Sequence, residues 1–341
     1  MNKHTFVIIG CGRIAQRHAE HIQNYGHLVA VCDIKRERAD DLAKRYNCRA
    51  YYDLGELLTN EPDIEVVSIC TPNYLHAPQT IQSLEVGKHV VCEKPMALST
   101  RDCENMIFAA EKYHRRLFIV KQNRYNPPIQ ELKQAIENDK LGKILSVELN
   151  CFWNRNEAYY QDSDWKGILQ KDGGTLFTQF SHFIDLILWL VGDITDVKVF
   201  RGNFLHKGLI EFEDSGVVAL KFYNGALGSI HYTVNSYRKN MEGSITIFGE
   251  KGSVKIGGQY LNALEYDEIE GFHFSHTEVV NKANDYGFYQ GSMSNHDKVY
   301  ENVINVLDGQ ETIATNSIEG MKVVRVIEKI YSESKLENLS E

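Results

Sequence analysis

The chain has 341 residues, of which 43% are hydrophobic and 24% charged, with a formal net charge of −9. This length predicts two domains, and the composition is that of an ordinary globular protein. The acidic balance excludes a broad nucleic-acid-binding surface, which requires a basic face. It still permits an anionic small molecule, because a pocket needs only a few local cations.

No stretch approaches the roughly 18 apolar residues of a membrane-spanning helix, and the first residues lack the pattern of a signal peptide. The seven cysteines include no C-x-x-C pair, and most lie in apolar, strand-like runs. Without an export signal, this pattern predicts reduced, buried thiols in a cytoplasmic protein with no membrane association.

Residues 1–121 are predicted to alternate short apolar strands with amphipathic helices. This alternation is typical of a parallel sheet covered on both faces, and right-handed crossovers then give a doubly wound (Rossmann) α/β domain. The predicted strands are Thr5–Ile9, Leu28–Cys32, Val66–Cys70, His89–Cys92 and Leu117–Val120. The predicted helices are Ile14–Asn24, Glu37–Tyr46, His76–Val86 and Thr100–His114.

Residues 122–341 are predicted to form a second domain of the α+β class. Strands with period-two alternation run from residue 197 to about 279, with a hairpin signal at Asn224-Gly225, which indicates a large, mostly antiparallel sheet. Helices can cover one face of such a sheet, and a partner subunit can cover the other, so we expect a homo-oligomer, a tetramer or else a dimer. The other predicted elements are a helix after Pro127-Pro128, a strand over Ile144–Trp153, and helices over Thr175–Val191, Ser294–Leu307 and Ser317–Tyr331.

The segment from Gly10 to Ala15, Gly-Cys-Gly-Arg-Ile-Ala, matches the G-x-G-x-x-A fingerprint of dinucleotide-binding domains. It follows the first predicted strand and opens the first predicted helix, which is the context that the fingerprint requires. Gly10 permits the tight turn and Gly12 lets the backbone approach a diphosphate, which would lie on the helix N-terminus at Arg13 and Ile14. The alternative is a glycine turn without a ligand.

Asp33 follows the second predicted strand, 23 residues after Gly10. A carboxylate here hydrogen-bonds the adenosine ribose and repels a 2′-phosphate, which favours NAD over NADP. Lys35 and Arg36 come directly after it and would tolerate that phosphate. Asp33 has a simpler alternative role as the cap of the next helix.

Two further polar segments follow the third and fourth predicted strands, at the carboxyl edge where doubly wound sheets bind ligands. Thr71, Asn73 and His76 form the first segment, and Glu93-Lys94-Pro95 forms the second. Because Lys94 lies between apolar runs, its ammonium is expected to be partly desolvated, with a lowered pKa that suits holding or deprotonating an alcohol. The alternative is an exposed lysine paired with Glu93.

The order and spacing of these motifs resemble the glucose–fructose oxidoreductase/inositol dehydrogenase (Gfo/Idh/MocA) family, over essentially the whole chain. The resemblance implies an NAD-dependent dehydrogenase that oxidises a sugar hydroxyl. It implies that His182 is the general acid/base and that Lys94 positions and polarises the hydroxyl. The cofactor-binding residues that it implies are Gly10, Gly12, Arg13, Ile14, Asp33, Thr71, Asn73, His76, Glu93, Lys94, Gln122, Trp165 and Lys166.

The second half departs from the family at two positions before His182. The family usually has Asp four residues before this histidine and Gly two residues before it, whereas this chain has Thr178 and Phe180. One branch tolerates a neutral residue at the first position, namely bacterial enzymes resembling UDP-N-acetylglucosaminuronate 3-dehydrogenase. Other features similar to that branch are Tyr159-Tyr160, Asp164–Gly167, Asp172–Gly174, Tyr286–Tyr289 and Asn316–Glu319.

The branch resemblance implies a UDP-linked N-acetylhexosaminuronate as substrate, oxidised at its 3-hydroxyl, in the synthesis of polysaccharide precursors such as those of lipopolysaccharide. Such a ligand needs donors for its phosphates and carboxylate, and aromatic side chains for stacking. The candidate substrate-binding residues are Lys94, Arg124, Asn126, Arg155, Tyr159, Tyr160, Thr178 and His182. For those in loops the alternative is simple solvent exposure.

Two other functions stay open at this point. One is dehydrogenation of a free sugar or inositol, and the other is a non-catalytic NAD-binding sensor, which would have no need of Lys94 and His182. No metal site is expected, because the histidines are scattered without an H-x-x-x-H or Cys/His cluster.

Overall fold

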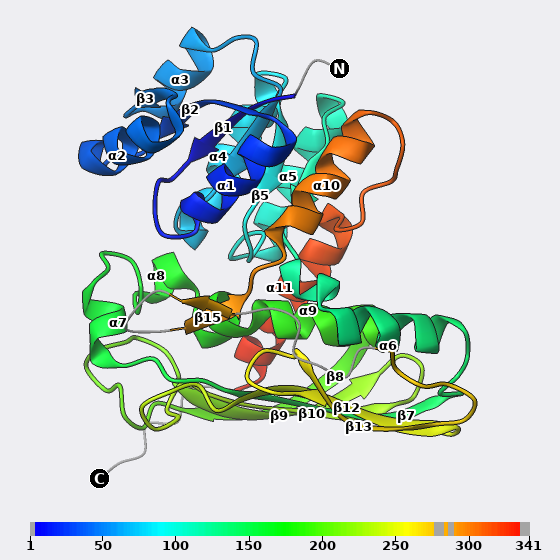
Figure 1. The fold of residues 1–341 in the computed structure, drawn as a ribbon. Coiled ribbons are helices and arrows are strands. Elements are labelled where there is room, and N and C mark those ends of the chain that lie inside the picture. Colours follow the sequence, from blue (N-terminus) through cyan, green and yellow to red (C-terminus); the bar gives the residue numbers. More distant parts are fainter. Residues whose placement is uncertain (1–3, 276–282, 286–289, 335–341) are drawn as a thin grey trace. The chain divides into compact units, whose positions relative to one another are not determined.

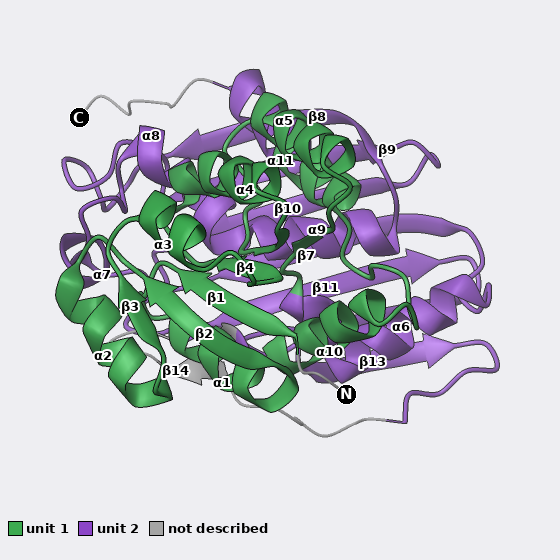
Figure 2. Cartoon of the chain, turned by 90° about the horizontal axis from the view of Figure 1, so that it is seen from above, with its two compact units in different colours: residues 1–121, 296–324 green, residues 122–295, 325–341 purple. Residues whose placement is uncertain are grey.

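The structure, a computed structural model, describes residues 4–275, 283–285 and 290–334. The chain forms two compact units, coloured separately in Figure 2. Unit 1 comprises residues 1–121 and 296–324, and unit 2 comprises residues 122–295 and 325–341. The segment Tyr286–Tyr289, one of the branch features above, lies outside the described residues. No helix within the described ranges is long and apolar enough to cross a membrane.

Unit 1 is built on a parallel six-stranded sheet in the order β3-β2-β1-β4-β5-β6. This is the strand order of a Rossmann domain, so the predicted doubly wound fold is confirmed. The central strands are apolar and fully buried because helices cover both faces of the sheet. The strands are β1 (Thr5–Ile9), β2 (His27–Cys32), β3 (Arg49–Tyr51), β4 (Val66–Ile69), β5 (His89–Cys92) and β6 (Leu117–Ile119).

The crossover helices of unit 1 agree with the predicted ones, and the structure adds two elements. Strand β3 has only three residues, with Arg49 exposed, and α3 has only seven residues, so neither carries a periodic signal. Helix α3 begins where the Asp53 carboxylate accepts the Glu56 N–H at 2.9 Å. The helices are α1 (Ala15–Tyr25), α2 (Arg36–Tyr46), α3 (Leu54–Asn60), α4 (His76–Glu85), α5 (Thr100–Lys112) and the short 3₁₀ helix η1 (Asn73–Leu75).

Two helices from the far end of the chain complete unit 1. The sequence assigned both to the second domain, but α10 (His296–Leu307) packs beside α1, and the first part of α11 (Ser317–Glu333) also belongs to this unit. The Tyr300 hydroxyl on α10 reaches His18 Nδ1 at 2.7 Å and Ser68 Oγ at 2.8 Å. These buried hydrogen bonds fix α10 to the Rossmann sheet, and the order of elements along the chain does not reveal them.

Unit 2 contains a seven-stranded sheet in the order β13-β12-β11-β7-β10-β9-β8. All neighbours are antiparallel except β7 and β10, so the predicted large, mostly antiparallel sheet is confirmed. The hairpin predicted at Asn224-Gly225 joins β9 to β10. The strands are β7 (Ile144–Phe152), β8 (Ile194–Gly202), β9 (Ser215–Phe222), β10 (Leu227–Thr233), β11 (Glu242–Gly249), β12 (Gly252–Gly257) and β13 (Ala263–Ile269), with a separate small pair of β14 (Ala283–Asp285) and β15 (Gln290–Met293).

Helices α6 and α9 lie along one face of this sheet (Figure 1). The helix predicted over Thr175–Val191 has a π-helical first part, η3, before α9; such π segments are frequent at functional sites. The other face of the sheet carries exposed apolar side chains: Phe200, Val217, Leu227, Phe248 and Tyr266. The helical segments of unit 2 are η2 (Gln122–Tyr125), α6 (Pro127–Glu137), α7 (Glu157–Gln161), α8 (Leu169–Asp172), η3 (Leu176–Phe180) and α9 (Ser181–Leu190).

Candidate functional site

The glycine loop lies between β1 and α1, at the carboxyl edge of the parallel sheet. Gly10 has a φ of +89°, and a Cβ atom there would lie 2.8 Å from the carbonyl carbon and oxygen of Cys70. Only glycine therefore fits at this turn. At Gly12, by contrast, a Cβ atom would meet no atom within 4 Å, so the backbone borders open space. This combination fits a loop that approaches a dinucleotide diphosphate closely.

Asp33 closes the same loop from the end of β2. Its carboxylate accepts the Cys11 N–H at 2.8 Å on one oxygen and the Lys35 N–H at 2.8 Å on the other. It does not cap α2, whose first flanking residue is Lys35. A carboxylate oxygen can accept more than one hydrogen bond, so both oxygens keep acceptor capacity for ribose hydroxyls. The alternative role as a helix cap is excluded.

The residues after Asp33 bear on the choice between NAD and NADP. The Arg36 guanidinium lies over the Tyr52 ring, 4.0 Å from its centroid, and that stacking directs its charge toward the ring. Ile34, which directly follows Asp33 in the sequence, is 82% exposed, which is unusual for a large aliphatic side chain. Sequence patterns did not single out Ile34, since an isolated apolar residue after a strand carries no signal of its own.

The segments that follow β4 and β5 are fastened to each other through His76. Its Nδ1 lies 2.7 Å from the Pro95 carbonyl oxygen, and its Nε2 lies 2.8 Å from the Thr71 carbonyl oxygen. The ring is buried, and burial lowers the pKa of His76 although both carbonyl contacts oppose this. Thr71 in turn donates its hydroxyl to Gln79 at 2.6 Å. His76 therefore holds together two loops of the carboxyl edge.

Glu93 is the centre of a buried hydrogen-bond network in unit 1. Its Oε1 atom lies 2.8 Å from His18 Nε2 and 3.2 Å from His296 Nε2, and its Oε2 accepts the Lys94 N–H at 3.1 Å. Burial alone would raise the pKa of Glu93, but the two histidines outweigh it and hold the pKa well below the usual range. Burial lowers the pKa of His296. The network therefore holds an ionised carboxylate one residue before Lys94.

These three side chains also have the composition of a metal site. The ligand atoms of His18, Glu93 and His296 all lie within 4.8 Å of one another, a group that the scattered histidines of the sequence did not suggest. Hydrogen bonding accounts for the geometry: Tyr300 donates to His18 Nδ1, and both Nε2 atoms donate to Glu93. With this assignment the buried carboxylate accepts a hydrogen bond from each histidine, as a buried charge requires.

Lys94 follows Glu93 directly and is half-buried at the carboxyl edge. Its peptide bond to Pro95 is cis. In unit 1 the structure thus gathers the predicted residues at the ends of β1, β2, β4 and β5, which are neighbouring strands. The residues gathered are Gly10, Gly12, Arg13, Ile14, Asp33, Thr71, Asn73, His76, Glu93 and Lys94.

His182 is the second residue of α9 in unit 2, and only 2% of its surface is exposed. Its ring lies against Trp153, with the ring centroids 5.6 Å apart, and against Phe183 at 4.7 Å. Phe180, where the family usually has glycine, fills the core between Trp153 at 5.3 Å and Tyr232 at 6.1 Å. Aromatic packing therefore fixes the start of α9 in this chain.

Thr178 lies in η3, one turn before His182. Its hydroxyl donates to the Asp172 carboxylate, the last residue of α8. Asp172 is 1% exposed, and its second oxygen accepts the Gly167 N–H at 2.8 Å. A buried carboxylate is thus joined to the position where the family usually has its own. Sequence comparison by position does not reveal this, because the carboxylate lies six residues earlier.

Arg155, Gln179 and Tyr159 form a buried chain of hydrogen bonds beside these residues. Arg155 Nε donates to Gln179 Oε1 at 2.7 Å, and Gln179 Nε2 donates to the Tyr159 hydroxyl at 2.7 Å. Lys166 lies over the Tyr159 ring with its Nζ 3.8 Å from the centroid, and both Lys166 and Trp165 are half-buried. Burial raises the pKa of Tyr159, so its hydroxyl stays protonated. Two cations and a phenol therefore gather in this part of unit 2.

Three of the predicted substrate-binding residues make close contacts within unit 2. Arg124 makes a buried bidentate pair with Asp185 of α9, with both N–O distances 2.7 Å, so its charge is compensated. Asn126 is fully buried, and its amide bonds the carbonyl oxygens of residues 260 and 261 at 3.0 Å and Asn295 at 2.7 Å. Tyr160 packs in an apolar cluster with Tyr159, Ile210 and Phe212. Gln122, expected to bind cofactor, is buried in η2.

A buried network around Glu213 supports the start of η3, and sequence reasoning missed it. Tyr331 donates to Glu213 Oε1 at 2.7 Å and accepts the Leu176 N–H at 3.0 Å. A Cβ atom at Gly174 would lie 2.4 Å from the Tyr331 hydroxyl, which explains a glycine here. Burial raises the pKa of Glu213 to about 7, despite the opposing effects of Tyr331 and Arg201.

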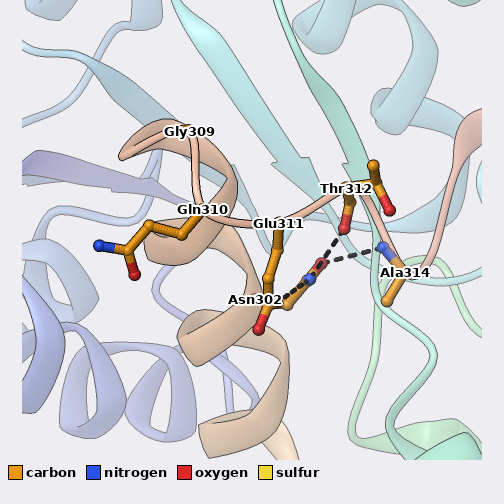
Figure 3. Close-up of a pocket in the computed structure, with 6 residues that line it drawn as sticks. All are labelled: Asn302, Gly309, Gln310, Glu311, Thr312 and Ala314. Carbon is orange, nitrogen blue, oxygen red and sulfur yellow. Dashed lines mark hydrogen bonds between the residues drawn. The ribbon is translucent and has the colours of Figure 1, made fainter.

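A hollow is lined by the end of α10 and the loop that follows it (Figure 3). Its central residue, Asn302, donates to Glu311 Oε2 at 2.8 Å and to the Thr312 carbonyl at 3.0 Å, and accepts the Ala314 N–H at 3.0 Å. These bonds fold the loop back onto α10. The polar groups joined by dashed lines in Figure 3 therefore serve the loop itself.

The fold and the carboxyl-edge loops define an NAD-binding oxidoreductase with a Rossmann unit and an α/β unit. The chain belongs to the Gfo/Idh/MocA oxidoreductase family: residues 4–121 match its NAD-binding Rossmann fold, and residues 133–337 match its C-terminal alpha/beta domain. The resemblance to this family and the expected NAD cofactor are thereby confirmed.

Two solved structures are similar to the chain over almost its whole length. The WlbA dehydrogenase from Chromobacterium violaceum, in complex with NADH and UDP-GlcNAcA, is 36% identical with a TM-score of 0.89, covering 98% of this chain and 94% of that one. The WlbA dehydrogenase from Bordetella pertussis, with the same two ligands, is 34% identical with a TM-score of 0.87, covering 97% and 96%. Myo-inositol 2-dehydrogenase from Thermotoga maritima is 29% identical over 72% of this chain and 73% of its own.

Proposed function

We propose that this protein is an NAD-dependent dehydrogenase that oxidises a ring hydroxyl, at C3, of a UDP-linked N-acetylhexosaminuronate. The observation that carries the proposal is the similarity to two WlbA dehydrogenases, at 36% and 34% identity over 98% and 97% of this chain. Their structures contain NADH and UDP-GlcNAcA. The setting that we propose is synthesis of polysaccharide precursors, such as those of lipopolysaccharide.

The proposed cofactor contacts follow from the carboxyl edge of unit 1. The diphosphate would lie at Gly12 and on the N-terminus of α1, and Asp33 would accept hydrogen bonds from the ribose hydroxyls. Exposed Ile34 offers an apolar surface to the adenine. Thr71, Asn73, His76, Glu93 and Lys94 hold the remaining part, together with Gln122, Trp165 and Lys166 of unit 2. The Asp33 carboxylate and the stacked Arg36 both favour NAD over NADP.

Lys94 and His182 carry the chemistry in this proposal. Bound NAD supplies the acceptor for the hydride that leaves the carbon being oxidised. His182 takes the proton of the same hydroxyl, and the C–O bond becomes a carbonyl. Lys94 donates a hydrogen bond to that oxygen and stabilises the negative charge that develops on it. Glu93, held by His18 and His296, fixes the backbone from which Lys94 extends.

Unit 2 supplies the proposed contacts to the anionic parts of the substrate. Arg155 donates hydrogen bonds to oxygens of Gln179, Asn154 and Asn240, which orient its guanidinium, and we place an anionic group of the substrate beside it. Lys166 is the second cation, and Tyr159 is the aromatic partner on which it stacks. Arg124 and Asn126 rank below these residues as substrate contacts, because Asp185 and backbone carbonyl oxygens already engage their polar groups, and Tyr160 stays a candidate beside Tyr159.

A second candidate is oxidation of a free sugar or inositol, which the similarity to myo-inositol 2-dehydrogenase favours. The two candidates differ in charge, since a UDP-linked uronate carries phosphates and a carboxylate and inositol carries none. Cations such as Arg155 and Lys166 suit the anionic first substrate better than the uncharged second.

The test is NADH formation, followed by absorbance, against UDP-linked uronates, neutral UDP-sugars, free sugars and inositol. We expect turnover with UDP-linked N-acetylhexosaminuronates and none with inositol. Lys94→Ala should lower kcat by about a hundredfold or more while NADH still binds. The control variant is Lys44→Ala, which replaces an exposed lysine of α2 and should leave kcat unchanged. Equal turnover by Lys94→Ala and the wild type would contradict the mechanism, and turnover of inositol alone would favour the second candidate.

The proposal includes a homo-oligomer, with a tetramer expected before a dimer. Phe200 of β8 and Val217 of β9 are directly paired and are 71% and 45% exposed on the sheet face opposite the helices. Leu227, Phe248 and Tyr266 continue this apolar surface, which a second subunit would cover. A cytoplasmic setting agrees with the seven free cysteines.

A further inference from the structure

The residue at position 178 combines access with a buried partner. Thr178 is half-buried, whereas the other residues of η3 are buried, so its side chain is the one in this segment that a ligand can reach. Its hydroxyl donates a hydrogen bond to the carboxylate of Asp172. A threonine hydroxyl has one proton, so with that proton committed its oxygen offers only lone pairs to a further partner.

Asp172 is fixed by bonds on both of its oxygens. One oxygen accepts from Thr178 and the other accepts the Gly167 N–H at 2.8 Å, while only 1% of the residue is exposed. No substrate therefore reaches this carboxylate directly. Its charge still acts on Thr178, because a hydroxyl that donates to a carboxylate is polarised and becomes a stronger acceptor.

We infer that Asp172 is a positioning residue that acts through Thr178 and makes its oxygen an obligatory acceptor for a hydroxyl of the substrate. This rests on the proposed function, and it restores by an indirect route the carboxylate that the family usually has at position 178. The pair also tolerates an anionic sugar better than a carboxylate at position 178 would. The negative charge lies one hydrogen bond deeper than in the family pattern, so a substrate carboxylate or phosphate meets a neutral oxygen and is repelled less.

A purely structural role for Asp172, holding the turn at Gly167, predicts different behaviour. In that case removal of the Thr178 hydroxyl alone would leave catalysis intact, and moving the carboxylate to position 178 would bring no benefit. Asp172→Asn keeps the shape and an oxygen for the Gly167 N–H but removes the charge. Thr178→Val keeps the shape and removes the hydroxyl, and Thr178→Ser keeps the hydroxyl.

The experiment measures kcat and KM for the UDP-linked uronate, with NADH affinity from fluorescence titration as the control for an intact unit 1. We expect Asp172→Asn and Thr178→Val each to lower kcat/KM by roughly 10- to 100-fold. The double variant Asp172→Asn/Thr178→Val should be no worse than either single variant, because both remove the same interaction. Thr178→Ser should retain most of the activity.

The decisive variant moves the carboxylate to the family position. Asp172→Asn/Thr178→Asp should recover activity relative to Asp172→Asn, and should shift the kcat/KM preference from the anionic sugar toward neutral sugars. Three results would each overturn the inference. They are wild-type activity in Thr178→Val, additive losses in Asp172→Asn/Thr178→Val, and no recovery in Asp172→Asn/Thr178→Asp. If the wild type turns over no UDP-sugar, the proposed function is wrong. If the wild type and Thr178→Val turn over the UDP-linked uronate equally, the proposed function stands and only this inference is wrong.

Discussion

Gly10 and Gly12 differ in the surroundings that an added methyl group would meet. Alanine at these two positions therefore tests two properties separately, stability at Gly10 and cofactor binding at Gly12. At Gly10 a Cβ atom would lie 2.8 Å from Cys70 backbone atoms and from Thr71 Cγ2, at a φ of +89°. At Gly12 a Cβ atom would meet nothing within 4 Å, and the backbone is outside the left-handed region. Alanine at the first position therefore strains the fold, and alanine at the second only fills the space assigned to the diphosphate.

The expected free energies follow from these surroundings. For Gly10→Ala, the left-handed backbone costs about 1–2 kcal/mol and the forced contacts about 1–3 kcal/mol, so the free energy of unfolding should fall by about 2–5 kcal/mol. For Gly12→Ala, the loss of unfolded-state entropy should change stability by no more than about 1 kcal/mol, in the stabilising direction. NADH affinity should nevertheless fall at least about tenfold, equivalent to about 1.4 kcal/mol.

Both quantities are measured on the same two variants. Urea unfolding followed by circular dichroism gives the stability, and NADH fluorescence titration gives the dissociation constant. If Gly12→Ala binds NADH within about twofold of the wild type, the diphosphate does not lie at Gly12. If Gly12→Ala is destabilised by more than about 1 kcal/mol, a methyl group there is not in open space and the packing argument fails.

Three further predictions concern unit 2. Because burial raises the pKa of Glu213 from 4.5 to about 7, its contribution to stability is full below about pH 4.5 and is lost as pH rises through about 7. The unfolding free energy of the wild type should therefore fall between pH 5 and pH 8, and Glu213→Gln should make this fall smaller by up to about 3 kcal/mol. Urea unfolding of both proteins at the two pH values measures the difference. Asp185→Ala leaves the Arg124 charge buried and uncompensated, so urea unfolding should show a loss of about 3–5 kcal/mol; a loss under about 1 kcal/mol would contradict the ion pair. Phe200→Glu should lower the oligomeric state in sedimentation analysis, whereas an unchanged state would exclude this sheet face as the subunit contact.

The fold was predictable wherever its signal was local and periodic. Strands β1, β4 and β5 are buried runs of β-branched residues, and the hairpin at Asn224-Gly225 has its own turn signal. Strand β3 and helix α3 were not predicted because three and seven residues are too short for a period to emerge. Helix α10 was predicted as a helix, but its packing in unit 1 was not, because buried polar contacts to α1 and β4 select that position and leave no periodic signal.

The candidate site shows the same limit. Gly10, Asp33 and Lys94 were found because each lies directly at the end of a strand, where topology alone brings the loops together. The partners of charged groups were not found, because they are distant in sequence. Glu93 is compensated by His18 and His296, and these lie 75 and 203 residues away along the chain. A residue type and a position do not reveal whether a charge is available or already paired.

Thr178 is the position where this limit matters most for function. When the sequence is compared with the family position by position, threonine replaces the aspartate that usually lies four residues before the histidine, so a carboxylate is missing at position 178. In space the carboxylate is present, because Gly173 and Gly174 have φ values of +90° and +121° and turn the chain between α8 and η3. That turn brings Asp172 into hydrogen bonding with Thr178, six residues later. If Thr178 contacts the substrate as we propose, the departure from the family pattern moves the negative charge one hydrogen bond away from the substrate, and this would alter which substrate charges the site tolerates.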